Sequence, residues 1–286
     1  MAANAAALRG ITKQYKDFTL GPVDMTVPAG SIVGLIGENG AGKTTLLKIL
    51  CGVNRADDGT VDLLGGSPAD AATRAKIGVV FEDAFFYGSF TAAQVGRSMA
   101  GVYGARWRDE AFAAYLRRFG LDAGKKLKEY SRGMRLKLSL AAALAHDPEL
   151  LVLDEATAGL DPVVRGELMD LFLEFIQDER HSIIMSSHIT ADLEQVADSI
   201  AYLHNGQLLF QENKDDLLQE YGVLHCGESS LPSLPADLVI FTKHGAFGCE
   251  TLVKDRAAVR ELLPDAVCDA AGLDDIMRFY SGRDAQ

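Results

Sequence analysis

The architecture of this chain of 286 residues follows from one run, Gly37-Glu-Asn-Gly-Ala-Gly-Lys-Thr-Thr45. The run comes directly after the mostly apolar residues 31–36, which predict a buried strand, and it leads into a predicted helix over residues 45–51. A strand, a glycine-rich turn and a helix N-terminus in this order can wrap a polyphosphate in backbone N–H groups. A chance match in a loop that binds nothing would lack this flanking strand and helix. The sequence therefore predicts a site for a nucleoside triphosphate.

Each kind of residue in this loop has an expected task. The glycines let the backbone approach the phosphates, Lys43 reaches the β- and γ-phosphates, and Thr44 places its hydroxyl on Mg²⁺. We expect the nucleotide to contact Gly37, Asn39, Gly40, Ala41, Gly42, Lys43, Thr44 and Thr45.

The composition is that of a globular protein without a membrane span. Hydrophobic residues make up 48% of the chain, and no apolar run approaches the length that a bilayer requires. The N-terminus shows no positively charged segment followed by a long apolar one, so we expect no signal peptide. The four cysteines have no metal-binding spacing, which favours a reducing cytosol, and Cys51 is expected to be a small core residue.

The charge of the chain bears on its partners. A net charge of −12 and a pI near 4.9 weigh against direct binding to nucleic acid and against unaided adhesion to an anionic membrane. Arg132, Arg135 and Lys137 form only a small basic patch.

Strand and helix patterns alternate over residues 1–213, which predicts an α/β domain with a mostly parallel sheet. Short strands are expected at residues 12–15, 18–20 and 25–27, a strand and turn at 59–66, and buried strands at 76–81, 150–153 and 182–185. Apolar residues at helical spacing predict an inserted helical subdomain over about residues 89–146 and an amphipathic helix over residues 168–176.

The composition shifts after residue 213, and we expect residues 214–286 to form a small α+β accessory domain. A hairpin is predicted from residues 237–242 and 249–253, and helices from residues 256–263 and 273–280.

Two further groups of polar residues are expected at the edge that carries the phosphate loop. Asp154 and Glu155 follow the apolar strand 150–153, and parallel strands deliver such side chains to the crevice at their carboxyl ends. Asp154 can hold Mg²⁺ through water, and Glu155 can orient and deprotonate an attacking water. His188, after the strand 182–185, can contact the γ-phosphate and hold the geometry of the water.

The stretch Tyr130-Ser-Arg-Gly-Met134 opens a helix, with Ser131 as a natural N-cap. Gly133 leaves backbone N–H groups accessible, so this helix N-terminus can bind an anion. An ordinary N-cap explains the local chemistry equally well, and both interpretations stay open at this point.

Taken together, these motifs resemble the ATP-binding cassette (ABC) ATPases over roughly residues 8–212. The resemblance implies a P-loop NTPase core that binds ATP and Mg²⁺. It also implies that Ser131 and Gly133 bind the γ-phosphate of ATP held by a second copy, so that two cassettes close head to tail around two ATPs. The stretch Thr157-Ala-Gly-Leu-Asp161 resembles the D-loop, with Asp161 at the subunit contact. Tyr15 occupies the position of an aromatic that stacks on adenine, with Phe18 as the alternative.

The chain departs from the usual family pattern at two points. Glu82 stands where family members usually carry Gln, and it can still bind Mg²⁺ while adding negative charge beside the γ-phosphate. The Tyr-Ser-Arg-Gly-Met form of the signature resembles the subgroup that powers type 2 ABC exporters of bacteria, and the C-terminal residues 273–280 resemble the tail of that subgroup.

The aromatics Phe85, Phe86, Tyr87 and Phe90 lie where transporters of this family receive a helix of the membrane subunit. They are expected either to form such an interface or to belong to the core of the helical subdomain.

The resemblance implies an ATPase that works as a homodimer on a separate transmembrane permease, peripheral to the cytoplasmic face of the cell membrane, and drives export. Two alternatives stay open: a soluble cassette ATPase that acts on nucleic acid or the ribosome, and a regulatory module that binds ATP with little turnover.

Overall fold

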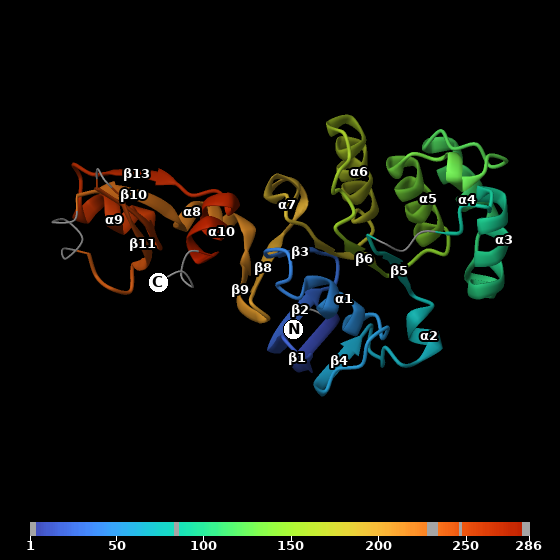
Figure 1. Ribbon diagram of the computed structural model, residues 1–286, viewed down its shortest axis with the longest axis horizontal. Helices are drawn as coiled ribbons and strands as arrows, with labels where there is room; N and C mark the ends of the chain where they lie inside the picture. Colours follow the sequence, from blue (N-terminus) through green and yellow to red (C-terminus); the bar gives the residue numbers. More distant parts are fainter. Residues whose placement is uncertain (1–3, 83–85, 228–233, 246–247, 282–286) are drawn as a thin grey trace. The chain divides into compact units, whose positions relative to one another are not determined.

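A computed structural model describes residues 4–82, 86–227, 234–245 and 248–281 of the chain (Figure 1). The chain divides into two compact units, of which the first comprises residues 1–197 and 201–211 and the second comprises residues 198–200 and 212–286. The assignment of residues 1–213 to a nucleotide-binding domain and of residues 214–286 to an accessory domain stays a prediction.

A six-stranded sheet forms the centre of the first unit. In spatial order its strands are β5 (Ile77–Val80), β6 (Leu150–Asp154), β7 (Ser182–Ser186), β3 (Ile32–Ile36), β8 (Ser199–His204) and β9 (Gln207–Asn213). The first four are neighbours in parallel, and every residue of β3, β6 and β7 is buried. Strands covered on both faces read as continuous apolar runs, which is why the sequence identified them. The expected parallel sheet is confirmed.

Four helices follow strands or turns of this core. They are α1 (Lys43–Leu50), α2 (Ala71–Arg74), α6 (Pro162–Phe175) and α7 (Thr190–Val196). Asp161 caps α6 and Pro162 occupies its first turn, where the missing N–H costs nothing. Leu168, Leu171 and Phe172 are buried on the predicted apolar face.

A three-stranded antiparallel sheet packs its apolar residues into the same core, and here the sequence prediction was wrong in detail. The sheet has the order β2–β1–β4, with β1 spanning Asn4–Gln14, β2 spanning Thr19–Pro28 and β4 spanning Asp58–Leu63. Two long strands thus replace the three short ones expected at residues 12–15, 18–20 and 25–27. The pairing of β1 with β2 continues past Gly21 and Pro22 through shifts in register, so residues that usually end a strand do not end this one.

The predicted helical subdomain lies between β5 and β6, as expected. Its helices α3 (Ala92–Tyr103), α4 (Asp109–Arg118) and α5 (Arg132–Leu144) lie side by side (Figure 1). Two 3₁₀ turns, Gly104–Arg106 and Leu127–Glu129, connect them. The subdomain has its own apolar cluster, which includes Val95, Trp107, Phe112, Leu116 and Leu138.

The aromatic run before α3 divides between the two expectations. Phe86 and Phe90 pack against the apolar cluster of the helical subdomain, whereas Tyr87 is 78% exposed. Phe85 lies outside the described residues. The run therefore contributes to the core and also leaves one ring at the surface.

The second unit is an α+β fold, as predicted. Its antiparallel sheet has the order β11–β12–β10–β13, formed by β10 (Gly222–Cys226), β11 (Val239–Gly245), β12 (Gly248–Val253) and β13 (Val267–Ala270). The expected hairpin is β11–β12. The expected helices are α9 (Arg256–Leu262) and α10 (Leu273–Ser281), and α8 (Lys214–Glu220) precedes β10. An apolar cluster around Leu224, Val253, Val259 and Cys268 holds the unit together.

Candidate nucleotide-binding and catalytic site

The loop between β3 and α1 is shaped by glycine. Gly42 caps α1 with a φ of 107°, which only glycine adopts readily, and a Cβ at this position would lie 2.9 Å from Phe18 Cζ and 3.0 Å from Leu20 Cδ1. A Cβ on Gly37 would collide with the carbonyl oxygen of Leu203. The backbone can therefore fold tightly in front of α1, and the N–H groups of the first turn of that helix become available to an anion.

A cavity of about 460 Å³ lies against this loop. Most of the residues expected to contact nucleotide line it, together with both candidate aromatics: Tyr15, Phe18, Glu38, Asn39, Gly40, Gly42, Lys43, Thr44, Thr45, Lys48, Asn54, Glu82 and Glu155. The rings of Tyr15 and Phe18 are 6.4 Å apart, and Tyr15 is 42% exposed. Either ring can therefore offer a face to a base.

The hydroxyl of Thr44 and the carboxylate of Asp154 are directly connected. Thr44 Oγ1 donates a hydrogen bond of 2.8 Å to Asp154 Oδ2, and Ser186 Oγ donates one of 2.7 Å to Asp154 Oδ1. Ser186 Oγ also accepts a hydrogen bond from the backbone N–H of Glu155 at 3.0 Å. Asp154 is 2% exposed, so this network fixes a carboxylate that has almost no contact with solvent.

Glu155 lies between the phosphate loop and His188. Its Oε1 is 3.2 Å from Lys43 Nζ, and its Oε2 is 2.6 Å from His188 Nδ1. Lys43 Nζ also donates to the carbonyl oxygens of Gly37 at 2.6 Å and Glu38 at 3.2 Å. Three of the predicted chemical residues, from α1, the end of β6 and the end of β7, thus meet at one point.

The backbone of Glu155 is in the left-handed region, with a φ of 49°. Its Oε1 is buried and makes no hydrogen bond, although it faces the ammonium of Lys43. A buried carboxylate oxygen with spare capacity is the group that a catalytic base requires, because it can accept a proton or a hydrogen bond from water.

The oxygen atoms at this site suit Mg²⁺. Mg²⁺ prefers hard oxygen ligands and usually keeps several waters and substrate phosphates in its shell, so that protein sites supply only one or two ligands. Thr44 and Asp154 supply such a pair, with their oxygens 2.8 Å apart. In the described part of the chain no group of three or more His, Cys, Asp or Glu side chains could hold a metal. The Thr44–Asp154 pair fits the one or two protein ligands that Mg²⁺ usually takes beside substrate phosphates.

Glu82, the third predicted metal ligand, is engaged elsewhere. Its Oε1 lies 2.9 Å from a terminal guanidinium nitrogen of Arg132, at the start of α5. The same guanidinium packs against Gly159, where an added Cβ would lie about 3.5 Å from it. Glu82 still lines the nucleotide cavity, but its carboxylate is directed to a cation of its own chain.

Known proteins resemble this chain in sequence over the same region. The sequence model of the ABC transporter family matches residues 20–158. The bacitracin transport ATP-binding protein BcrA of Enterococcus faecalis is 35% identical over 212 residues, which cover 72% of this chain and 68% of BcrA. The lantibiotic transport ATP-binding protein SrtF of Streptococcus pyogenes is 33% identical over 214 residues, which cover 73% of this chain and 90% of SrtF.

This chain belongs to the ABC transporter ATP-binding family. The family's cassettes are ATPases, and the fold agrees: a solved ATP-binding subunit of an ABC transporter superposes with a TM-score of 0.68 at 28% identity, over 74% of this chain and 91% of that subunit. An uncharacterised ABC transporter ATP-binding protein of Synechocystis is 38% identical, but the match spans only 58% of its length.

The residues expected to form the signature and the D-loop lie at helix N-termini. Ser131 caps α5 and accepts a hydrogen bond of 3.2 Å from the N–H of Met134. Asp161 caps α6 and accepts bonds from the N–H groups of Val163 at 3.1 Å and Val164 at 3.0 Å. Among the described residues, those that line the cassette's own nucleotide cavity do not include Ser131, Gly133 or Asp161.

Two residues at the site carry no local signal of their role in the sequence. Ser186 was visible only as a serine at the end of a strand, and its bond to Asp154 depends on the parallel register that places the two residues opposite each other. In the sequence, Arg132 stands out only as part of the unusual signature and of a small basic patch. Its ion pair with Glu82 joins residues fifty positions apart, which no local pattern reveals.

Proposed function

We propose that this chain is the ATP-binding and ATP-hydrolysing subunit of a bacterial ABC exporter. The observation that carries the proposal is the contact chain from Lys43 through Glu155 to His188, beside the Thr44–Asp154 pair. A binding module without chemistry has no need for a buried carboxylate held between a lysine and a histidine.

In the proposed reaction the residues of the cassette position the reactants and move one proton. The first turn of α1 and Lys43 would hold the β- and γ-phosphates. Thr44 and Asp154 would hold Mg²⁺, which would supply positive charge to neutralise the phosphate oxygens. Glu155 accepts a proton from a water molecule while the oxygen of that water attacks the γ-phosphorus. The bond between the γ-phosphorus and the bridging oxygen of ADP breaks at the same time. His188 fixes the carboxylate of Glu155 through its Oε2, which leaves Oε1 for the water.

A second copy of the chain completes this site. Ser131 and Gly133 lie at the N-terminus of a 13-residue helix, α5, where partial positive charge and open N–H groups favour an anion. Since they do not line the nucleotide cavity of their own chain, we infer that they bind the γ-phosphate held by the partner. Asp161 then lies at the contact between the two copies.

A separate transmembrane permease is the proposed partner. None of the described helices has the length and apolar character that crossing a bilayer requires. BcrA and SrtF are named as transport ATP-binding proteins, and cbiO1 of Clostridium perfringens, 25% identical with a TM-score of 0.62, is described as part of the transporter complex cbiONQ. The exporter assignment rests on the resemblance of residues 130–134 to the type 2 exporter signature. An exporter subunit of this kind would act at the cytoplasmic face of the membrane.

The test is recovery of the partner. Tagged Glu155→Gln protein is purified from detergent-solubilised native cells with ATP and Mg²⁺ present, and co-purifying proteins are identified by mass spectrometry. We expect a stoichiometric protein with about six apolar spans of roughly 20 residues each. The Ser131→Arg form of the same protein serves as a control, because it should lose the ATP-dependent part of the recovery. Capture of ribosomal proteins, RNA or DNA instead would support the soluble alternative and contradict the exporter assignment.

A further inference from the structure

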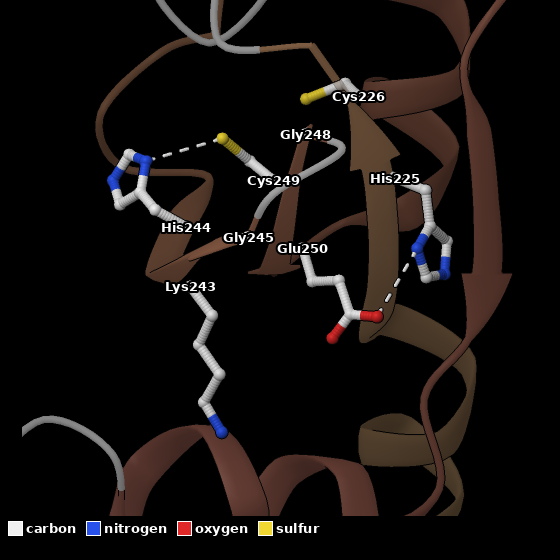
Figure 2. Close-up of a pocket in the computed structure, with 8 residues that line it drawn as sticks. All are labelled: His225, Cys226, Lys243, His244, Gly245, Gly248, Cys249 and Glu250. Carbon is white, nitrogen blue, oxygen red and sulfur yellow. Dashed lines mark hydrogen bonds and ion pairs between the residues drawn. The ribbon is translucent and has the colours of Figure 1, made fainter.

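Two of the four cysteines are brought together in the second unit. Cys226 at the end of β10 and Cys249 at the start of β12 are direct partners in the antiparallel register. Cys249 is also the direct partner of His244 on β11, since β12 lies between the other two strands. Direct cross-strand partners project to the same face of a sheet, so the two thiols and the imidazole share one face. Figure 2 shows this arrangement, with the imidazole of His244 directed at the sulfur of Cys249.

The spacing of such partners suits a disulfide. Directly opposite residues in an antiparallel pair have Cα atoms about 4.5–5.5 Å apart. A disulfide requires a Cα separation of about 4.4–6.8 Å, so both kinds of opposite pair lie within this range. All four cysteines of the chain are described, and each carries a thiol. Burial, and to a lesser extent the proximity of Cys249, raises the pKa of the Cys226 thiol, which agrees with two sulfurs near each other.

The two thiols differ in access. Both cysteines line a cavity of about 520 Å³, and Cys226 also lines a second one of about 540 Å³. Cys226 is half-buried, whereas Cys249 is only 3% exposed. A small reagent can therefore reach Cys226 first, and Cys249 is placed to react next.

The other cysteines are excluded as partners. The sulfur of Cys268 on β13 lies near Gly222, at the opposite end of β10 from Cys226. A Cβ on Gly222 would be 2.8 Å from this sulfur. Cys51 belongs to the core of the first unit, and burial raises the pKa of its thiol to about 12.

We propose that Cys226 and Cys249 form a dithiol site that reacts with low-molecular-weight disulfides, such as glutathione disulfide, and closes to an intrachain disulfide. The thiolate of Cys226 attacks one sulfur of the reagent, whose S–S bond breaks, and one small thiol leaves. The thiolate of Cys249 then attacks the sulfur of Cys226 in this mixed disulfide and releases the second small thiol. Both cysteines lose a proton and are oxidised by two electrons in total, and the reagent is reduced to two thiols.

His244 assists the second step. Its Nδ1 lies 3.5 Å from Cys249 Sγ, close enough to accept the proton that the thiol loses. His244 is itself exposed, so the proton can pass on to solvent.

The test is thiol mapping of the purified full-length protein after incubation with glutathione disulfide at about pH 8. The protein is denatured in acid, its remaining thiols are alkylated, and the products are digested and identified by mass spectrometry. We expect the wild type to lose two hydrogens and to yield a peptide pair cross-linked between Cys226 and Cys249. Cys249→Ser should stop at one glutathionyl group on Cys226, and Cys226→Ser should not react at Cys249.

Two more variants separate the proposal from its alternatives. Cys268→Ser is the matched control and should close as the wild type does, while His244→Asn should form the mixed disulfide normally and close it several-fold more slowly. Wild-type protein that keeps the glutathionyl group on Cys226 with Cys249 still alkylated would overturn the proposal. An unreactive Cys226, or a cross-link to Cys268, would overturn it as well. Circular dichroism of each variant confirms that the sheet is retained.

Discussion

At the scale of single residues, Glu155 combines a strained backbone with the proposed role of general base. A non-glycine residue in the left-handed region costs on the order of 1–3 kcal/mol, and it persists only where the surroundings fix it. Lys43 and His188 hold the two carboxylate oxygens, and Ser186 binds the backbone N–H. Strain of this kind gathers at active sites, and here it turns the side chain after Asp154 back towards the phosphate loop.

His146 is a second residue whose chemistry depends on burial. It is 1% exposed, its Nε2 donates a hydrogen bond of 3.0 Å to the carbonyl of Ile77, and its ring stacks on Tyr103 at 3.8 Å. Burial disfavours the charged imidazolium and lowers the pKa of His146 from its ordinary value of 6.5. The folded protein therefore holds this ring neutral between β5 and the end of α5.

This pKa predicts how the first unit responds to acid. Below about pH 6.5 the unfolded chain binds a proton at His146 that the folded chain does not bind, so acidification favours unfolding. The stabilisation from His146 is complete above this pH and is lost as the pH falls towards the lowered value. We expect the urea midpoint, followed by the fluorescence of Trp107, the single tryptophan of the chain, to fall between pH 7.5 and 5.5.

The histidine is tested by substitution. His146→Gln should lower the midpoint at pH 7.5 and flatten its dependence on pH. His225→Gln, an exposed histidine of the second unit, should leave the slope unchanged. An equal slope in the wild type and in His146→Gln would contradict this account of His146.

At the scale of elements, the Glu82–Arg132 ion pair is one of several that join the sheet and α6 to the helical subdomain in the described part of the chain. Glu82 follows β5, Arg132 opens α5, and both side chains are about half exposed. An exposed pair of this kind contributes only about 0.2–1 kcal/mol to stability. Its role is therefore better explained by charge: Arg132 balances the carboxylate that this chain carries beside the nucleotide, where its family usually has an amide.

If Arg132 neutralises the charge of Glu82, a substitution at Glu82 should compensate for the loss of Arg132. Arg132→Ala leaves Glu82 unpaired beside the phosphates, and we expect ATP affinity to fall about fivefold, the equivalent of about 1 kcal/mol. Adding Glu82→Gln should restore most of that affinity, as measured by nucleotide titration and by steady-state ATPase activity. Lys137→Ala, which removes the ion pair of the same helix with Glu167, is the control. If Arg132→Ala has the same effect with Glu and with Gln at position 82, the two residues are not coupled.

How much of this the sequence could predict depends on whether a signal is local. The strand, loop and helix around Lys43 are contiguous, and their pattern predicted the fold and most of the loop residues that line the cavity. Gly21 and Pro22 were misleading, because β1 and β2 continue past them with a shifted register. The pairs Glu82–Arg132 and Cys226–Cys249 join distant positions, so they depend on the tertiary structure and on strand register.

At the scale of the whole molecule, the proposed working unit is two copies of the chain. Ser131→Arg places a long cation at the N-terminus of α5, where we infer that the partner's γ-phosphate binds. Nucleotide binding should be retained, because Ser131 does not line the chain's own cavity, and ATP-driven dimerisation should be lost.

Multi-angle light scattering of Glu155→Gln protein with ATP and Mg²⁺ measures this directly. The protein should elute as a dimer, and the same protein with Ser131→Arg should elute as a monomer. Ser98→Arg, at an exposed position of α3, controls for added charge. A dimer in the Ser131→Arg form would rule out the inferred role of α5 in the contact between copies.

If Glu155 deprotonates the attacking water, its replacement by Gln should abolish hydrolysis without abolishing nucleotide binding. Steady-state ATP hydrolysis is compared for the wild type, Glu155→Gln and Glu149→Gln. Glu149 is the control, because it is a partly exposed carboxylate that pairs with Lys76 and does not line the nucleotide cavity. We predict that Glu155→Gln keeps its ATP affinity and loses hydrolysis by on the order of 100-fold or more, the scale of a missing general base, while Glu149→Gln stays near wild type. Hydrolysis by Glu155→Gln at close to the wild-type rate would show that Glu155 is not the general base.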